Sequence, residues 1–75
     1  MGGKKSRIRN RIKRIRLART DLTQVELARR IGATRQTVIA IEGERYAPSL
    51  ELAFRLSRVL GEPIEELFQF DGEWD

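Results

Sequence analysis

Apolar residues recur at the spacing of one helical face through the middle of the chain. We expect a helix to begin after Thr23, because Thr23 and Glu26 have the spacing of a capping box, which satisfies two backbone N–H groups at a helix start. The buried face of this helix is expected to contain Leu27, Ala28 and Ile31. Gly32 follows that face and supplies the left-handed residue that commonly ends a helix.

A second helix is expected directly after the turn that contains Gly32. Thr34 is its expected N-cap, and Val38 and Ile41 are spaced to form its buried face. Two helices joined by a short turn that contains a glycine have the arrangement of a helix-turn-helix, which we assign to residues 23–42. The second helix of such a pair, here residues 34–42, typically enters the major groove of DNA.

Three further helices are expected around this pair. The first has Asn10 as its N-cap and ends at Thr20, the next lies between Ser49 and Gly61, and a short last helix has Pro63 in its first turn. The expected inward residues are Ile12, Ile15 and Ala18 in the first of these helices, and Leu52, Ala53, Leu56 and Leu60 in the next.

The two ends of the chain indicate short strands. Residues 6–10 alternate between polar and apolar side chains, and Phe68 and Phe70 flank Gln69. We expect the two segments to pair as an antiparallel ribbon, which needs support from the helices or a second subunit because an isolated ribbon is marginal in water. The predicted fold is all-α, with five helices and this ribbon, in one domain of residues 6–75 after a flexible basic N-terminus at residues 1–5.

Composition argues against several classes of function. The chain has 75 residues, no cysteine and no histidine, so we expect no disulfide, metal site or cofactor, and no nucleophile–base pair of the kind an enzyme needs. No apolar run approaches the roughly 20 residues of a membrane span, so we expect a cytoplasmic protein without membrane contact. A chain this short buries only about 60% of its unfolded surface, which favours dimerisation. No small-molecule effector is indicated.

Charge is distributed unevenly along the chain. Residues 1–45 contain thirteen Lys and Arg against four Asp and Glu, whereas residues 46–75 contain two against seven. The basic half includes the expected helix-turn-helix. This polarity fits a protein with one face on a polyanion and another turned away from it, and the plainer alternative is a solvated surface without such a role.

Three motifs, in this order, resemble the lambda Cro/repressor-like helix-turn-helix proteins, also called the XRE family. They are T-Q-x-x-L-A-x-x-x-G at residues 23–32, T-R-Q-T-V-x-x-I-E at residues 34–42 and Y-x-P-S-L-x-L-A at residues 46–53. The ending P-I-E-E-L-F-Q is similar to short stand-alone members such as the cytolysin-operon repressor. The resemblance implies five helices, a small terminal ribbon and a homodimer.

The resemblance and the chemistry of the side chains predict a set of DNA contacts. Arg bonds guanine and Gln bonds adenine in the major groove, each worth about 1–3 kcal/mol of discrimination, and apolar side chains suit thymine methyl groups. The expected base-reading residues are Arg35, Gln36, Ile39 and Ala40. The expected phosphate contacts are Arg11, Lys13, Gln24, Thr34, Thr37, Arg45 and Tyr46. Alternatives stay open for three of these residues: Arg35 on a phosphate, Gln36 as a solvated helix residue, and Ile39 in the core or an interface.

Two features near the end of the second motif helix have expected structural roles. In the family, the residues that match Arg16 and Glu42 form a partly buried salt bridge, and the resemblance implies one here. The family usually has glycine one position after Gly43. Glu44 is therefore expected in a left-handed backbone site, or Gly43 absorbs the turn one residue earlier and moves Arg45.

The acidic C-terminal half is expected to form the dimer surface, with residues 62–74 as its main segment. It contains more apolar surface than a monomer of this size easily hides, and exposed apolar patches mark partner surfaces. The expected interface residues are Phe54, Ile64, Phe68 and Phe70. The alternative is that these side chains complete the core.

These observations favour a sequence-specific transcriptional regulator of double-stranded DNA. The preferred form is a homodimeric repressor that reads a two-fold operator with residues 34–42 in the major groove. One alternative is an antitoxin or restriction-controller type of regulator with a protein partner. Another is a protein-interaction adaptor of the same fold that does not bind DNA, against which the basic half, Gln24, Arg35 and Gln36 argue.

Overall fold

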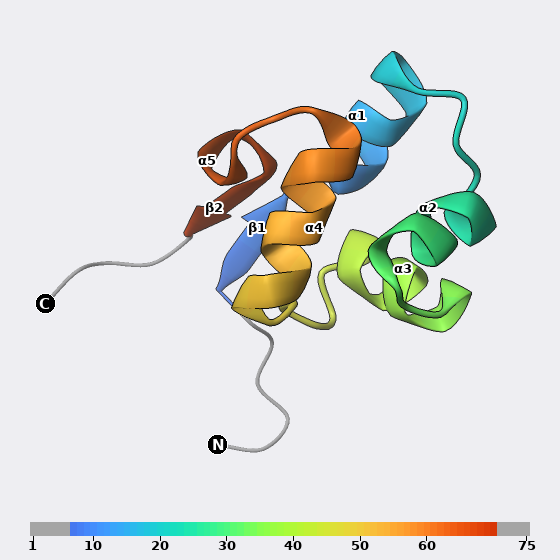
Figure 1. Cartoon of the computed structure of the whole chain (residues 1–75). Helices are drawn as coiled ribbons and strands as arrows, with labels where there is room; N and C mark the ends of the chain where they lie inside the picture. The colour runs from blue at the N-terminus through green and yellow to red at the C-terminus, as the bar shows by residue number, and fades with distance from the viewer. Residues whose placement is uncertain (1–6, 71–75) are drawn as a thin grey trace, which may run out of the picture.

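The computed structural model describes residues 7–70 as five helices and one two-stranded antiparallel ribbon. In chain order the elements are β1 (Ile8–Asn10), α1 (Ile12–Arg19), α2 (Gln24–Ile31), α3 (Arg35–Glu42), α4 (Leu50–Leu60), α5 (Ile64–Leu67) and β2 (Phe68–Phe70). Helix α4 crosses the middle of the molecule, with α2 and α3 on one side and α5 and the ribbon on the other (Figure 1). The predicted all-α architecture of five helices with a terminal ribbon is confirmed.

One apolar core joins the helices. Its buried members are Ile12, Leu27, Ala28, Ile31, Val38, Ile41, Leu56, Leu60 and Leu67. The predicted inner faces of α2 and α3 are therefore buried, and Leu52 of α4 packs at the edge of the core. The prediction for Ala18 is wrong, because α1 turns Ile12 and Arg16 inward, four residues apart on one face, and leaves Ala18 exposed.

Side chains close the start of three helices at the predicted residues. Glu26 N donates to Thr23 Oγ1 at 3.1 Å and Thr23 N donates to Glu26 Oε1 at 3.0 Å, which completes the capping box of α2. Thr34 and Ser49 each accept a backbone N–H from the first turn of α3 and α4. These caps satisfy donors that a helix start otherwise leaves unpaired.

The predicted starts of two other helices are wrong by one residue. Arg11, not Asn10, occupies the N-cap position of α1, because Asn10 is the last residue of β1 and pairs with Phe68. Asn10 Oδ1 nevertheless accepts a hydrogen bond from Ile12 N at 3.0 Å. Pro63 is the N-cap of α5 rather than part of its first turn, because its backbone is extended, with ψ of 155°.

The capping box makes the stability of the fold depend on pH. The backbone N–H of Thr23 lowers the pKa of Glu26 below its usual range. Because the folded-state pKa is the lower one, the ionised carboxylate stabilises the fold at neutral pH, and this contribution is lost as the pH falls through the folded-state pKa. We expect acidification to destabilise the parent more than Glu26→Gln in denaturant melts at a series of pH values. Parallel curves for the two proteins would contradict this expectation.

The terminal ribbon is short and is attached to the helices. β1 and β2 pair with Ile8 opposite Phe70, Arg9 opposite Gln69, and Asn10 opposite Phe68. Arg11 N extends the pairing with a 2.9 Å hydrogen bond to Leu67 O. β1 begins two residues later than the predicted strand. Three predicted parts of the chain lie outside the described residues: Ser6, the expected basic segment at residues 1–5, and residues 71–74 of the expected dimer segment.

Glu44 occupies the left-handed position in the turn after α3. Its φ is 61°, whereas Gly43 has φ of −83°, so the turn is not absorbed one residue earlier. Among residues 7–70, Glu44 is the one non-glycine residue with positive φ. This conformation costs an L-residue about 1–2 kcal/mol, which the surrounding contacts have to offset.

Candidate nucleic-acid interface

The turn between α2 and α3 is held from α4. Gly32 ends α2 in the left-handed region, with φ of 75°. Arg55 Nη1 donates to Ile31 O at 3.2 Å, and a Cβ added at Gly32 would lie only 2.6 Å from the same nitrogen. The left-handed backbone angle therefore favours glycine here, and a Cβ would in addition have to displace the Arg55 guanidinium. The sequence analysis missed Arg55, and its only signal was the four-residue spacing from Glu51, with which it forms an ion pair.

The first turn of α3 presents two polar side chains to solvent. Val38 and Ile41 are buried, which fixes the rotation of α3 about its axis. Arg35 and Gln36 are exposed and form no side-chain hydrogen bond or ion pair within the described part of the chain. Ile39 and Ala40 follow on the same helix and are half-buried. All four predicted base-reading residues thus lie outside the buried Val38–Ile41 stripe.

A buried ion pair locks the other end of α3 to α1. Arg16 Nε lies 2.8 Å from Glu42 Oε2, and Arg16 Nη2 lies 3.3 Å from Glu42 Oε1. The two side chains are only 8% and 4% exposed. Arg16 Nη1 also donates to Leu22 O at 3.0 Å, so the loop before α2 is joined to the same pair. The structure contains the salt bridge that the resemblance implied.

Gln24 belongs to this network as well. Its amide nitrogen donates to Glu42 Oε1 at 3.0 Å, so the side chain expected on a phosphate makes an internal contact. One amide hydrogen of Gln24 and the backbone N–H groups of Gln24 and Val25 stay available to an external anion, since the cap uses the N–H of Glu26. Gln24 thus fixes α2 against α3 and still lies where a phosphate contact is predicted.

Three of the predicted phosphate contacts meet in one hollow beside α3. Thr34, Thr37 and Tyr46 line a depression of about 360 Å³, together with Ser49 and Arg55, which the sequence analysis did not single out for this role. Thr34 Oγ1 and Thr37 Oγ1 lie 3.0 Å apart. Arg45 is exposed in the loop that leads to Tyr46. Hydroxyls and guanidinium groups around a hollow are the donors that commonly contact DNA phosphates.

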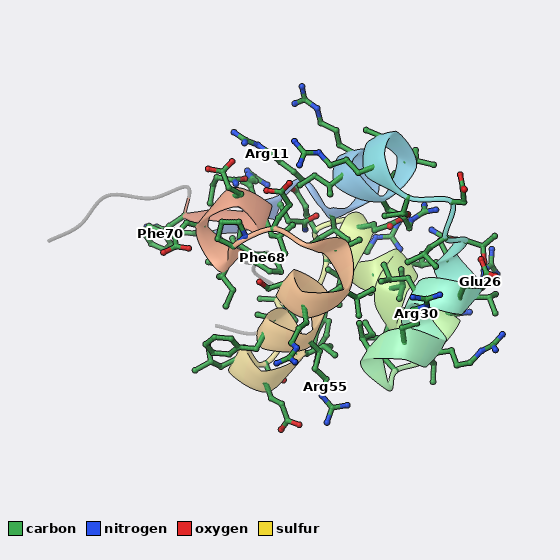
Figure 2. The ribbon with its side chains drawn as sticks, turned by 45° about the horizontal axis from the view of Figure 1, so that its top comes forward. Arg11, Glu26, Arg30, Arg55, Phe68 and Phe70 are labelled. Carbon is green, nitrogen blue, oxygen red and sulfur yellow. The ribbon has the colours of Figure 1, made fainter. Side chains whose placement is uncertain are left out.

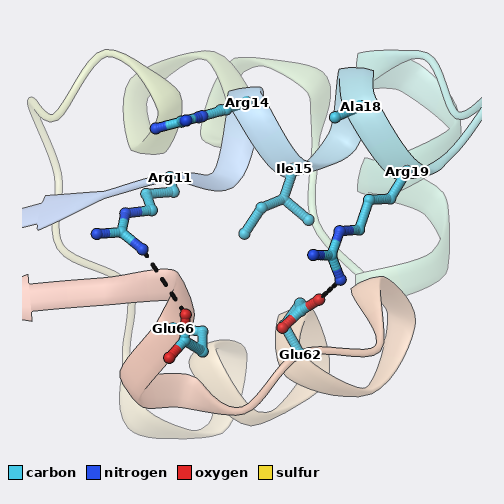
Figure 3. Close-up of a pocket in the computed structure, with 7 residues that line it drawn as sticks. All are labelled: Arg11, Arg14, Ile15, Ala18, Arg19, Glu62 and Glu66. Atoms are coloured by element: carbon cyan, nitrogen blue, oxygen red, sulfur yellow. Dashed lines mark hydrogen bonds and ion pairs between the residues drawn. The ribbon is translucent and has the colours of Figure 1, made fainter.

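The other two predicted phosphate contacts lie elsewhere. Arg11 faces α5 and pairs with Glu66 at 3.7 Å across a groove of about 360 Å³ (Figure 3). Arg19 pairs with Glu62 across the same groove, and Arg14 lines it without an ion pair inside residues 7–70. Lys13 is exposed on α1. The structure therefore does not bring Arg11 together with the hollow beside α3.

An apolar face lies on the side of α4 that carries the ribbon. We use this name for Leu50, Phe54, Ile64, Phe68 and Phe70. Phe54 is 58% exposed, Leu50 70% and Phe70 42%, whereas Phe68 packs partly against the core. Phe68 and Phe70 lie at the opposite end of the molecule from Glu26 and Arg30 of α2 (Figure 2). The sequence analysis did not include Leu50 in the expected interface. Leu50 could have been identified there because it is an apolar residue of α4 that lies off the buried stripe of that helix.

This face is hollowed as well as apolar. A groove of about 290 Å³ with mainly carbon walls is lined by Ile8, Pro48, Leu50, Ile64 and Phe68.

Within residues 7–70 no helix has the length and apolarity required to cross a membrane, and no three His, Cys, Asp or Glu side chains are grouped as a metal site requires.

Comparisons with known proteins agree with this geometry. The family model described as helix-turn-helix matches residues 12–67. The chain is 46% identical over 66 residues to an "Uncharacterized HTH-type transcriptional regulator" of Archaeoglobus fulgidus, covering 88% of this chain and 92% of the relative. A protein of the same description from Methanothermobacter thermautotrophicus is 61% identical over 51 residues, covering 67% of this chain and 74% of the relative.

A solved structure shares the fold at low sequence identity. It comes from Bacteroides fragilis, is described as a candidate DNA-binding protein, and superposes with a TM-score of 0.74 at 22% identity over 83% of this chain and 98% of that chain. At this identity the likeness concerns the fold alone. The family match and the relatives lead to one conclusion: the chain belongs to the helix-turn-helix family, in its lambda Cro/repressor-like or XRE type.

Proposed function

We propose that the protein is a sequence-specific transcriptional regulator that binds double-stranded DNA and inserts α3 into the major groove. The observation that carries the proposal is the first turn of α3. There Arg35 and Gln36 are exposed, without a side-chain partner among residues 7–70, beside the hollow lined by Thr34, Thr37 and Tyr46. Guanidinium and amide groups at the start of a recognition helix reach base edges, while the neighbouring donors contact phosphates. The names of the relatives support regulation of transcription.

The proposed active form is a homodimer that represses transcription by occupying a two-fold operator. A domain of this size gains stability from association, and the apolar face offers a contiguous surface for it. Phe68 and Phe70 of the apolar face lie at the opposite end of the molecule from Glu26 and Arg30 of α2 (Figure 2), which supports a dimer that leaves the helix-turn-helix uncovered. Symmetric dimers of this kind place their half-sites about 34 Å apart, one turn of DNA.

Selection of duplexes from a random pool by the purified protein tests the proposal. We expect an enriched inverted repeat when the selection is made at about 150 mM salt, where purely electrostatic binding is weak. Enrichment of one unrepeated motif would support sequence reading but contradict the two-fold operator. Recovery of no motif, with binding that disappears as salt increases, would contradict sequence reading and favour an adaptor role.

Phe54→Glu is expected to weaken the dimer without unfolding the protein. Phe54 is exposed, so a charge there is tolerated by the monomer but is desolvated when two copies associate. We expect the dimer dissociation constant, measured by sedimentation, to increase by at least roughly tenfold, since even 1.4 kcal/mol has that effect.

Leu17→Glu is the matched control for this variant. Leu17 is 62% exposed, close to the 58% of Phe54, but lies on α1, which contributes no residue to the apolar face or to its groove. The control should sediment like the parent, and both variants should keep the parent melting curve at concentrations where the protein is monomeric. Equal dimer dissociation constants for all three proteins would exclude Phe54 from the interface.

A further inference from the structure

Glu44 connects the turn after α3 to the terminal ribbon. Its carboxylate Oε2 accepts a hydrogen bond from Asn10 N at 2.9 Å, and Oε1 lies 3.3 Å from Arg9 Nη1. Both partners belong to β1, more than thirty residues earlier in the chain. Glycine would adopt a φ of 61° without strain, so the carboxylate contact to β1 is what glutamate adds at this position.

Asn10 makes a second connection at the same place. Its side-chain Nδ2 donates to Ile41 O, in the last turn of α3, at 2.8 Å. Its Oδ1 accepts from Ile12 N, at the first residue of α1. Asn10 therefore bonds to both the end of α3 and the start of α1, and the carboxylate of Glu44 accepts the backbone N–H of Asn10.

The ribbon continues this path to the apolar face. β1 pairs with β2 in the register that places Ile8 opposite Phe70 and Asn10 opposite Phe68. Phe68 and Phe70 are members of the apolar face. Direct contacts thus run from the C-terminal end of α3, through Glu44 and Asn10, to the surface on which the second subunit is proposed to pack.

We propose that Glu44 is a positioning residue that fixes α3 relative to the dimer surface and thereby sets the half-site spacing that the dimer accepts. The inference rests on the proposed function, because it requires a dimer that reads two half-sites. Without the carboxylate, the turn after α3 loses its hydrogen bond and ion pair to β1, and the two recognition helices of a dimer are then less firmly held at one separation. Glu44 itself need not touch DNA.

Binding to duplexes with different spacers tests this inference. The operator obtained by selection is rebuilt with its two half-sites moved apart or together by one or two base pairs, and a duplex with a single half-site serves as reference. We compare the parent with Glu44→Gly and Glu44→Gln, and use Asp21→Asn as the control for loss of one carboxylate charge. Asp21 is exposed in the loop between α1 and α2, outside the expected dimer segment, and its side chain forms no hydrogen bond or ion pair within residues 7–70.

The parent is expected to prefer one spacer by roughly tenfold or more, the equivalent of about 1.4 kcal/mol. Glu44→Gly should bind the single half-site as the parent does but accept all spacers nearly equally. Glu44→Gln should keep part of the preference, because its amide oxygen still accepts from Asn10 N while the charge that attracts Arg9 is gone. Asp21→Asn should keep the full preference, and thermal melts should show all four proteins folded.

Other outcomes overturn specific statements. An unchanged spacer preference in a folded Glu44→Gly protein overturns the positioning role and leaves the proposed function intact. Loss of single-half-site binding in Glu44→Gly also overturns it, because Glu44 would then act on α3 alone. A parent that shows no preference for two half-sites over one contradicts the dimeric operator-binding function itself.

Discussion

Replacing Glu42 with alanine is expected to lower the free energy of unfolding by about 3–5 kcal/mol. The guanidinium of Arg16 is buried, with its side chain 8% exposed, and Glu42 supplies the acceptors for its Nε and Nη2. Alanine leaves this charge with Leu22 O as the remaining acceptor and removes the acceptor of Gln24 as well. An uncompensated buried charge costs far more than the net contribution of the intact pair.

Thermal melting followed by circular dichroism measures this effect. A loss of 3–5 kcal/mol corresponds to a decrease in Tm on the order of 15 °C or more for a domain of this size. Glu51→Ala is the control, because Glu51 pairs with Arg55 on the surface of α4, where such a pair contributes about 0.5 kcal/mol or less. Equal melting temperatures for Glu42→Ala and the control would contradict the structural role of the Arg16–Glu42 pair.

Gln36→Ala is expected to reduce specificity at a single base pair of each half-site. Gln36 is exposed in the first turn of α3 and has no side-chain partner within the described residues, so its amide is free to bond a base edge. Loss of a bidentate contact costs about 1–3 kcal/mol of discrimination, or roughly 5- to 150-fold in affinity ratio. The measurement is the affinity for duplexes in which each position of the selected operator is changed in turn.

Arg45→Ala separates base reading from electrostatic attraction. Arg45 is exposed in the loop after α3 and is predicted to contact phosphate, so its removal should weaken binding to all duplexes alike and reduce the slope of log affinity against log salt by about one unit. Gln36→Ala should leave that slope unchanged. A Gln36→Ala protein that ranks every duplex as the parent does would remove Gln36 from the base-reading set.

Local patterns predicted the elements that local interactions stabilise. Thr23 with Glu26 and Gly32 define both ends of α2, because a cap and a left-handed glycine act within a few residues of the chain. The helical spacing of Leu27, Ala28 and Ile31 identified a buried face for the same reason. The starts of α1 and α5 were misplaced by one residue because β1 and the backbone of Pro63 take those positions.

Contacts between distant segments could not be predicted from such patterns. The approach of Arg55 to Gly32, the contact of Gln24 with Glu42 and the pairing of Arg11 with Glu66 each join different helices. Arg11 is an example. From the sequence it was expected to contact a phosphate, but in the fold it faces α5 and pairs with Glu66. The resemblance implied the Arg16–Glu42 pair, but spacing alone did not.

By itself, therefore, the sequence determined that five helices form, the caps and buried stripes of α2, α3 and α4, and the exposed start of α3, because propensity and periodicity act over one or two turns of the chain. Only the tertiary structure decided that Gln24 is partly used inside the protein, that Arg11 faces α5, and that Glu44 fastens the end of α3 to the ribbon. These contacts join residues 18 to 55 positions apart. These partners are set when the core packs α1, α2 and α5 against α4, and α3 against α1 and α2, which no local pattern specifies.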